Sequence, residues 1–265
     1  MNIHMGTSGW SYDQWVGPFY PRTIRPGSYL EYYSSIFDVV EIDSTFYNPP
    51  EERTIQKWKS QTPDNFKFCP KMFRKITHEL MLSSTQNEVD SFMRIIRGLG
   101  NKLGITLIQL PPSLRLKDIS ILKDFVENLP EGYDFAIEFR DESWFDPKVY
   151  SLLERNHITL VWADTPYARK HYHKTSELIY LRLVGDRSIS EDRFGSVILD
   201  RDSELEWWSL RLREMSRENE HSFVFANNHY QGFSPGTLNL FRKKLDLGEI
   251  DFSRMEGSGI QRRLF

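Results

Sequence analysis

The sequence predicts a single (β/α)8 barrel domain of the TIM type over residues 1–265. Three observations indicate this fold. Eight short apolar runs recur along the chain, helical patterns separate most of them, and 265 residues suit eight strand–helix units. No internal repeat, low-complexity tract or Gly/Ser linker divides the chain, so we expect one domain.

Each apolar run is short and rich in Ile, Val, Phe or Leu, as is typical of a parallel strand buried on both faces. The first run lies at the N-terminus and the last precedes a pair of asparagines. The predicted strands are 3–7, 39–43, 66–71, 105–110, 135–139, 158–163, 179–183 and 223–227.

The segments between the runs carry apolar residues at the three- and four-residue spacing of a helix. Thr85 and Glu88 form a capping-box pattern, and Gly100 marks the end of the same helix. Asp146 precedes Pro147, which is a favourable N-cap followed by a first-turn proline. The predicted helices are 28–37, 51–61, 85–99, 118–129, 147–155, 203–218 and 234–245, and the polar stretch 185–202 is expected to be an insertion after the seventh strand.

A doubly wound open sheet is the structural alternative. That fold normally follows its first strand with a glycine-rich phosphate-binding turn of the pattern G-x-G-x-x-G. Here the first turn reads Gly6-Thr7-Ser8-Gly9-Trp10, which lacks the pattern, so the barrel is favoured.

Composition restricts the compartment and the partners. Cys69 is the single cysteine, so an intrachain disulfide and a thiolate-rich metal site are excluded. The net charge of −3 disfavours a protein that coats nucleic acid. The N-terminus has no signal-peptide pattern, and no apolar run nears the ~20 residues of a membrane span. We therefore expect a cytoplasmic protein without a membrane segment.

Polar residues at the ends of the predicted strands are the main functional signal. In a barrel the carboxyl ends of all strands converge on one face, which carries the active site. Because side chains alternate along a strand, Glu41 and Asp43 share one side, as do Glu138 and Arg140. The sequence predicts a cup lined by Glu41, Asp43, Lys71, Gln109, Glu138, Arg140, Asp164, Arg182 and Asn228.

Glu41 and Glu138 are the candidate catalytic residues. Glycosidase-like hydrolysis needs two carboxyl groups ~5–10 Å apart in unlike environments. Lys71, Arg140 and Arg182 would bind a phosphate or stabilise developing negative charge. The competing interpretation is a buried ion-pair network that holds the barrel together, because buried charges must pair whatever the function. The expected substrate contacts are Lys71, Gln109, Arg140, Asp164, Arg182, Asn228, Trp10 and Tyr47, with the aromatic rings suited to a flat apolar ligand face.

A divalent metal is a less favoured alternative. Glu41, Asp43, Glu138, Asp164 and His229 offer mainly oxygen ligands, which suit Mg²⁺ or Mn²⁺. However, the seven histidines are scattered and no motif such as H-E-x-x-H is present. We therefore assign no metal ligand and leave the cofactor open.

Several short motifs are highly specific in combination. They are GTSGWSY at 6–12 with Trp15, FYP at 19–21, VEIDSTFY at 40–47, ITHE at 76–79, QLPPS at 109–113, EFR at 138–140 with SW at 143–144, and NNH at 227–229. On these residues the chain resembles the Domain of Unknown Function 72 (YecE-like) family over nearly its whole length. The resemblance implies a TIM-type barrel and implies little about activity. Two positions depart from the family pattern: Asp43 stands where Asn is more frequent, and Val184 stands where His is expected.

Three functions follow as hypotheses. The leading one is a hydrolase-like enzyme that acts on a polar sugar- or phosphate-containing substrate at the carboxyl-terminal face of the barrel. The second is a metal-dependent, endonuclease-like activity on damaged nucleic acid, by analogy with xylose-isomerase-like barrels. The third is a non-catalytic ligand-binding or adaptor protein whose charge cluster is structural. The oligomeric state is left open.

Overall fold

The computed structural model of the protein describes residues 2–216 and 221–252. Within these ranges the chain forms eight strands, and each matches a predicted run to within two residues. They are β1 Asn2–Thr7, β2 Val39–Ile42, β3 Lys67–Pro70, β4 Thr106–Gln109, β5 Phe135–Glu138, β6 Thr159–Asp164, β7 Ile179–Leu183 and β8 His221–Ala226.

The strands pair in parallel and follow one another in ring order. Six form a sheet in the order β1-β8-β7-β6-β5-β4, and β2 pairs with β3. A bridge between Ser8 and Glu41 connects β1 to β2, and a bridge between Lys71 and Leu107 connects β3 to β4. The Gly9 amide also donates to the Glu41 carbonyl at 2.8 Å. Hydrogen-bonded neighbours therefore run in chain order all round, as the predicted (β/α)8 topology requires.

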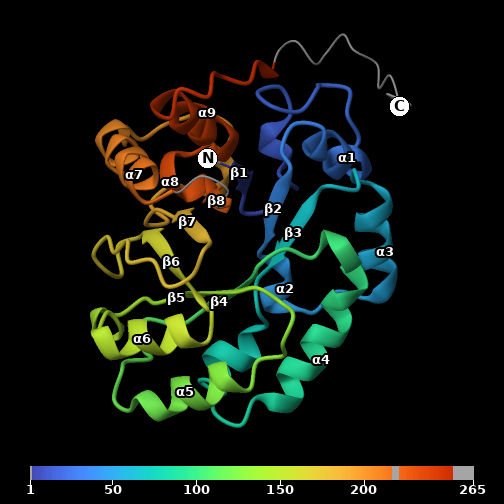
Figure 1. Ribbon diagram of the computed structural model, residues 1–265. Helices are drawn as coiled ribbons and strands as arrows, with labels where there is room; N and C mark the ends of the chain where they lie inside the picture. Colours follow the sequence, from blue (N-terminus) through green and yellow to red (C-terminus); the bar gives the residue numbers. More distant parts are fainter. Residues whose placement is uncertain (1, 217–220, 253–265) are drawn as a thin grey trace.

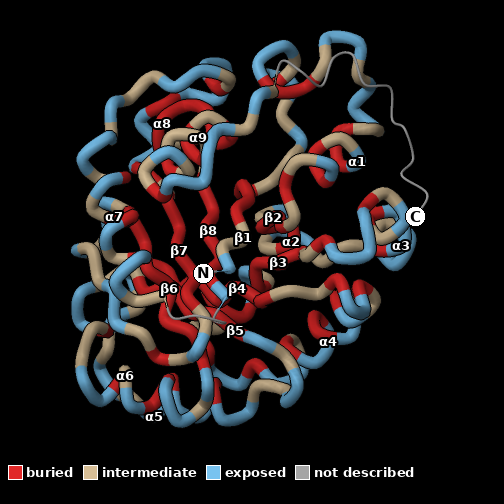
Figure 2. Tube along the Cα trace, turned by 45° about the horizontal axis from the view of Figure 1, so that its top comes forward, coloured by how far each residue is buried: buried red, intermediate tan, exposed pale blue. Residues whose placement is uncertain are grey.

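Helices surround the strands, which lie at the buried centre of the molecule (Figure 1, Figure 2). The seven predicted helices are present, with ends within three residues of the predicted ones; residues 217 and 218 of one prediction lie outside the described ranges. The α-helices are α1 Tyr29–Ser34, α2 Ser44–Tyr47, α3 Glu52–Ser60, α4 Gln86–Ile96, α5 Ile119–Glu127, α6 Pro147–Arg155, α7 Asp202–Met215, α8 Asn228–Gln231 and α9 Ser234–Lys244. None of the helices in the described ranges has the length and apolarity needed to span a membrane.

The first residues of α6 and α4 test two predicted N-cap signals. The Asp146 carboxylate accepts from the Lys148 amide at 2.8 Å, which confirms the predicted N-cap of α6. Thr85 does precede α4, but its side chain makes no cap bond, because the hydroxyl turns back to the Leu82 carbonyl at 3.4 Å. The capping box predicted there is therefore wrong, although the helix begins at the predicted place.

Several parts of the described chain have structure that the pattern did not predict. The five residues Lys75–Glu79 form a π-helix after β3, and the short helices α2 and α8 follow β2 and β8 directly. Residues 165–178 connect β6 to β7 without a helix. The predicted irregular insertion after β7 contains a single 3₁₀ turn, Glu191–Arg193.

Alternate strand positions fill the inside of the ring. One buried cluster contains Val39, Cys69, Leu107, Ala136, Val161, Tyr180 and Phe223, which come from seven different strands. The positions between them, such as Val40 and Ile108, pack in the two other core clusters together with helix side chains. Since side chains alternate, the residues two positions after the interior cluster also face the inside of the ring, at its carboxyl end. Glu41, Lys71, Gln109, Glu138 and Arg182 occupy these positions.

Candidate functional site at the carboxyl ends of the strands

A small hollow opens at the carboxyl end of the ring. Its lining comes from the ends of β2, β3, β5, β7 and β8 and from the segment after β6. The residues that line it are Asp43, Lys71, Arg140, Tyr167, Arg182, Val184, Gly185, Arg187, Asn227 and His229. Three of the predicted substrate contacts, Lys71, Arg140 and Arg182, therefore lie together at one opening.

Arg182 joins the two candidate catalytic carboxylates. Its Nε and Nη2 donate to the two oxygens of Glu41 at 2.8 and 2.5 Å, and its Nη1 donates to Glu138 Oε2. Both glutamates have a relative exposure of 0%. Tyr180 and Ser8 add two further donors to Glu41, at 2.9 and 2.7 Å. These five side chains form a dense polar network beneath the hollow. The two parallel hydrogen bonds from Arg182 to Glu41 are the bidentate, strong form of an ion pair.

Glu138 is held in its charged state. Burial by itself would raise the pKa of this carboxyl, but the guanidinium groups of Arg182 and Arg140 outweigh burial and lower the pKa to about 2. Arg140 contributes through its Nε, which donates to Glu138 Oε1 at 2.6 Å. At neutral pH Glu138 is therefore an anion that accepts hydrogen bonds and has no proton to deliver.

Lys71 and Asp43 face each other across the wall of the hollow. Lys71 Nζ lies 3.6 Å from Asp43 Oδ1, and Arg182 Nη2 lies 3.9 Å from the same oxygen. The ammonium also sits 4.4 Å from the ring centre of Phe46. Asp43 Oδ1 is buried and accepts no hydrogen bond from a described residue. Asp43 Oδ1 therefore has two cations at ion-pair distance and remains able to accept a hydrogen bond from a ligand.

The side chains around the hollow are mainly cationic, and their charge contributes to a lowered pKa of His78. Its ring lies edge-on to Phe46, with 4.8 Å between ring centres. Burial, followed by the charges of Lys71 and Arg140, lowers the pKa of His78 to about 4. This histidine is therefore neutral at physiological pH.

The remaining predicted substrate contacts are not among the residues that line the hollow. Gln109 donates to the Leu110 carbonyl at 3.2 Å. Asp164 accepts from Trp208 and Tyr230, each at 2.9 Å. Asn228 Oδ1 accepts from Trp15 at 3.2 Å and from Ser234 at 2.8 Å. Trp10 packs edge-on against Trp58, and Tyr47 is 57% exposed. Their roles as substrate contacts remain predictions, whereas the contacts that they make here connect parts of the fold.

Sequence reasoning missed several residues of this region, and two of them show why. Tyr180, which donates to Glu41, stands two positions before Arg182 in β7, so strand alternation places both on one side and could have identified it. Arg187 lines the hollow from the irregular segment after β7, at a positive φ of 61°. No periodic signal exists in such a segment, so Arg187 could not have been selected from the sequence.

Three of the residues considered as metal ligands, Glu41, Glu138 and Asp164, are engaged by other side chains. Arg182 occupies both glutamates, and Asp164 bonds to two aromatic side chains on the helix side of β6. Among the described residues, no group of three or more His, Cys, Asp or Glu side chains has the arrangement of a metal site.

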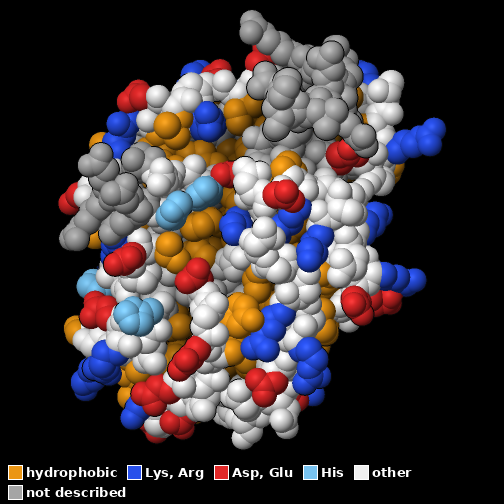
Figure 3. Space-filling view, turned by 45° about the vertical axis from the view of Figure 1, so that its right-hand side comes forward, with side chains coloured by type: hydrophobic (Ala, Val, Ile, Leu, Met, Phe, Trp, Pro, Cys, Tyr) orange, Lys and Arg blue, Asp and Glu red, His pale blue; other side chains and the backbone are white. Residues whose placement is uncertain are grey.

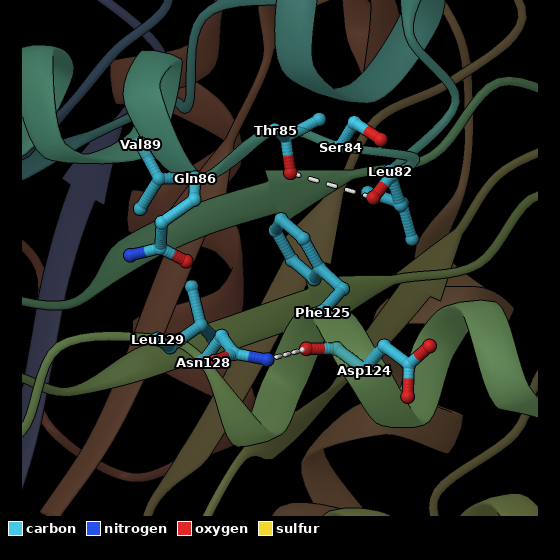
Figure 4. Close-up of a pocket in the computed structure, with 9 residues that line it drawn as sticks. All are labelled: Leu82, Ser84, Thr85, Gln86, Val89, Asp124, Phe125, Asn128 and Leu129. Atoms are coloured by element: carbon cyan, nitrogen blue, oxygen red, sulfur yellow. Dashed lines mark hydrogen bonds between the residues drawn. The ribbon is translucent and has the colours of Figure 1, made fainter.

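A second hollow lies on the outside of the barrel, between the start of α4 and α5 (Figure 4). Its polar groups bond to nearby backbone: Asn128 donates to the Asp124 carbonyl at 2.7 Å, and Thr85 donates to the Leu82 carbonyl. No set of charged side chains converges there. On the face seen in Figure 3, acidic and basic side chains are interspersed, in keeping with a net charge of −3. The hollow at the strand ends is therefore the candidate functional site.

Parallel strands in ring order, surrounding helices and a polar site at the carboxyl ends define a barrel-type α/β protein. The comparison with protein families agrees and is more specific. The chain belongs to the family described as "Protein of unknown function DUF72", whose pattern matches residues 4–257.

Relatives and solved structures give the same assignment. The chain is 25% identical to the UPF0759 protein YunF of Bacillus subtilis, covering 95% of this chain and 96% of that protein. It is 29% identical to the UPF0759 protein YecE of Escherichia coli over 54% of this chain, which is about half of that protein's length. A DUF72 family protein of Thermotoga maritima, TM1631, superimposes with a TM-score of 0.78 at 27% identity, covering 97% of this chain and all of that one. EF0366 of Enterococcus faecalis has the same fold, with a TM-score of 0.75, 22% identity and coverage of 94% and 98%. These relatives support the family and the fold, and their names state no activity.

Proposed function

We propose that the protein is an enzyme that binds a small, phosphate-bearing substrate in the hollow at the strand ends. Four cationic side chains line the hollow (Lys71, Arg140, Arg182 and Arg187), whereas Asp43 is the one carboxylate among its lining residues. Clefts lined mainly by one sign of charge concentrate ligands of the opposite sign. Of the expected sugar- and phosphate-containing substrates, the phosphate-containing class fits this lining better.

The unused hydrogen-bond donors carry this proposal. Arg140 uses Nε for Glu138, and its two terminal nitrogens donate to no described residue. The guanidinium lies 4.9 Å from the ring centre of Tyr167, which restricts its orientation. A planar guanidinium with both terminal nitrogens unused matches the geometry of a phosphate or carboxylate. Arg187 likewise forms no hydrogen bond or ion pair with a described residue and lies at the rim of the hollow.

Glu41 and Glu138 have a positioning role in this proposal. Their carboxylates bind three nitrogens of Arg182 and so fix its orientation beneath the hollow. Hydrolysis with the two glutamates as acid and base remains a prediction. It requires one of them to hold a proton, and the lowered pKa of Glu138 gives that residue little capacity to do so.

A non-catalytic ligand-binding protein is the second candidate. The observation in its favour is that Arg182 engages both buried glutamates, which is what a purely structural network would show. Both candidates require anion binding, and they differ in whether the bound compound is converted.

Titration calorimetry with inorganic phosphate and small phosphate monoesters tests the binding site. We expect Arg140→Gln to raise the Kd by about 10- to 100-fold, since a charge-assisted hydrogen bond contributes about 1.5–3 kcal/mol. Lys123→Gln is the matched control, because it removes an equal charge from the exposed face of α5. Equal affinity of Arg140→Gln and the control would contradict the proposal. Product formation from a bound ester, monitored by ³¹P NMR, separates the enzyme from the binding protein.

A further inference from the structure

Lys71 and Lys102 are the lysines that are buried among the described residues, and their environments differ. Lys102 Nζ donates to the Lys59 carbonyl at 2.7 Å, to the Thr62 carbonyl at 2.6 Å and to Thr62 Oγ1 at 3.2 Å. These three acceptors satisfy all three protons of the ammonium. Folding alone therefore accounts for the burial of Lys102.

Lys71 Nζ has no comparable set of hydrogen-bond acceptors. The residue is 9% exposed, yet its Nζ forms no hydrogen bond with a described residue. Its contacts are Asp43 Oδ1 at 3.6 Å and the Phe46 ring at 4.4 Å. An amine that is buried without acceptors costs stability, so folding alone does not explain this position. The nitrogen instead opens on the hollow at the end of β3.

The surroundings lower the pKa of this amine below that of an exposed lysine. Burial lowers the pKa of Lys71, and the charges of Arg182 and Arg140 act in the same direction, against the opposing carboxylates of Asp43 and Glu138. The neutral amine, not the ammonium, is the nucleophile, and a lysine is activated by desolvation and by neighbouring cations. The same arginines are available to bind the anionic part of a substrate.

We propose that Lys71 is a nucleophile that forms an imine with the carbonyl group of a small aldehyde or ketone phosphate. This inference rests on the proposed phosphate site, since Arg140 and Arg187 would hold the phosphate of that substrate. Lys71 Nζ adds to the carbonyl carbon, a C–N bond forms, and the oxygen takes up a proton to give a carbinolamine. Loss of that oxygen as water leaves the imine, so the atoms balance without an oxidant or reductant.

Asp43 is the group placed to move the protons in this step. Its Oδ1 lies 3.6 Å from Lys71 Nζ and accepts no hydrogen bond from a described residue. It can receive the proton that the nitrogen loses and return one to the departing oxygen. A carboxylate at this distance from the amine can transfer protons in any later step. That step could be hydrolysis of the imine, a carbon–carbon bond change or a proton transfer within the substrate.

Reductive trapping tests the inference directly. The full-length protein is incubated at neutral pH with glycolaldehyde phosphate and sodium cyanoborohydride, and the modified lysines are identified by peptide mass spectrometry. We expect Lys71 to be labelled at least about tenfold faster than exposed Lys123, and Lys102 to stay unlabelled. Inorganic phosphate should slow labelling of Lys71, and phosphate-free glycolaldehyde should label it at least about tenfold more slowly.

The outcomes separate the two proposals. If Lys71 stays unlabelled while Arg140-dependent phosphate binding persists, the imine is refuted and the anion site stands. If Lys71 reacts equally fast with both aldehydes, the reactive amine stands and the phosphate site is refuted. Lys71→Arg should abolish labelling at this position with an unchanged circular dichroism spectrum. Asp43→Asn should slow labelling and flatten its pH profile, whereas a purely structural Asp43 would leave the pH profile unchanged. The position of the label in the wild-type chain decides the question even if a variant fails to fold.

Discussion

Replacement of Arg182 by methionine should destabilise the fold strongly. The Arg182 side chain is 3% exposed, and its guanidinium donates to both Glu41 and Glu138, each of which is fully buried. Without it, Glu41 keeps two neutral donors, Ser8 and Tyr180, and Glu138 keeps Arg140. Breaking a buried ion pair by removal of one partner costs about 3–5 kcal/mol.

The lowered pKa of Glu138 gives the pH dependence of this network, to which Arg182 and Arg140 both contribute. The lowering from 4.5 to about 2 corresponds to about 3 kcal/mol of stability. Because the folded-state pKa is below the unfolded one, this contribution is complete above pH ~4.5 and is lost as the pH falls towards 2. Because Arg140 accounts for part of this shift, the expected loss for Arg182→Met is that of breaking a buried ion pair, about 3–5 kcal/mol at pH 7.

Urea unfolding at pH 7 and at pH 4.5 measures the effect. In Arg182→Met the buried Glu138 carboxyl loses one of its two guanidinium partners, so its pKa should rise and the destabilisation should shrink as the pH is lowered. Adding Glu138→Gln to this variant should recover part of the loss, because an uncompensated buried charge is removed. Arg53→Met is the control, since the Arg53–Glu51 pair is exposed and should contribute at most about 1 kcal/mol.

A loss of less than about 1 kcal/mol at pH 7, or a loss that does not change between pH 7 and pH 4.5, would refute the reasoning. Either result would mean that water reaches the glutamates, or that the backbone adjusts, once the guanidinium is gone.

Three further changes have expected outcomes. Gly185→Ala should lose about 1–3 kcal/mol of stability in urea unfolding, because Gly185 has φ +75° and an added Cβ would lie 2.3 Å from the His229 carbonyl oxygen; Gly132→Ala, at φ +79° with open space, should lose less. Cys69 should not react with a thiol reagent until the protein unfolds, because the side chain is fully buried and burial raises its pKa; rapid reaction of the folded protein would contradict this burial. Lys102→Met should lose about 1–3 kcal/mol, since two carbonyls and a hydroxyl lose their buried donor, and should leave phosphate affinity unchanged.

Local periodicity was sufficient to predict the strands and most helices. The run at 179–183 coincides with β7, and the helix at 147–155 coincides with α6, because burial on both faces and an N-cap are encoded within a few residues. Alternation then places Glu41, Glu138 and Arg182 inside the ring. This part of the candidate site therefore follows from the sequence once eight strands are recognised.

The hydrogen-bond partners of the polar side chains could not be predicted from the sequence in the same way. Asp164 and Asn228 stand beside strand ends, yet one bonds to Trp208 of α7 and the other to Ser234 of α9. Those contacts depend on how the later helices pack, which no local pattern specifies. The connection 165–178 gives a second example, because it is held by ring stacking, such as Phe145 with His171 at 3.6 Å between centres, instead of by a helix.

The pairing of β1 has a consequence for how the protein folds. Each of its six residues is in register with β8, whereas it meets β2 near its carboxyl end, through the bridge at Ser8 and the Gly9 amide. The first described strand therefore depends mainly on the last described one. Closure of the sheet joins positions more than two hundred residues apart, such as Thr7 and Ala226, and such distant pairings form slowly. A nascent chain that lacks β8 exposes open strand edges on both β1 and β7, which invite pairing between chains.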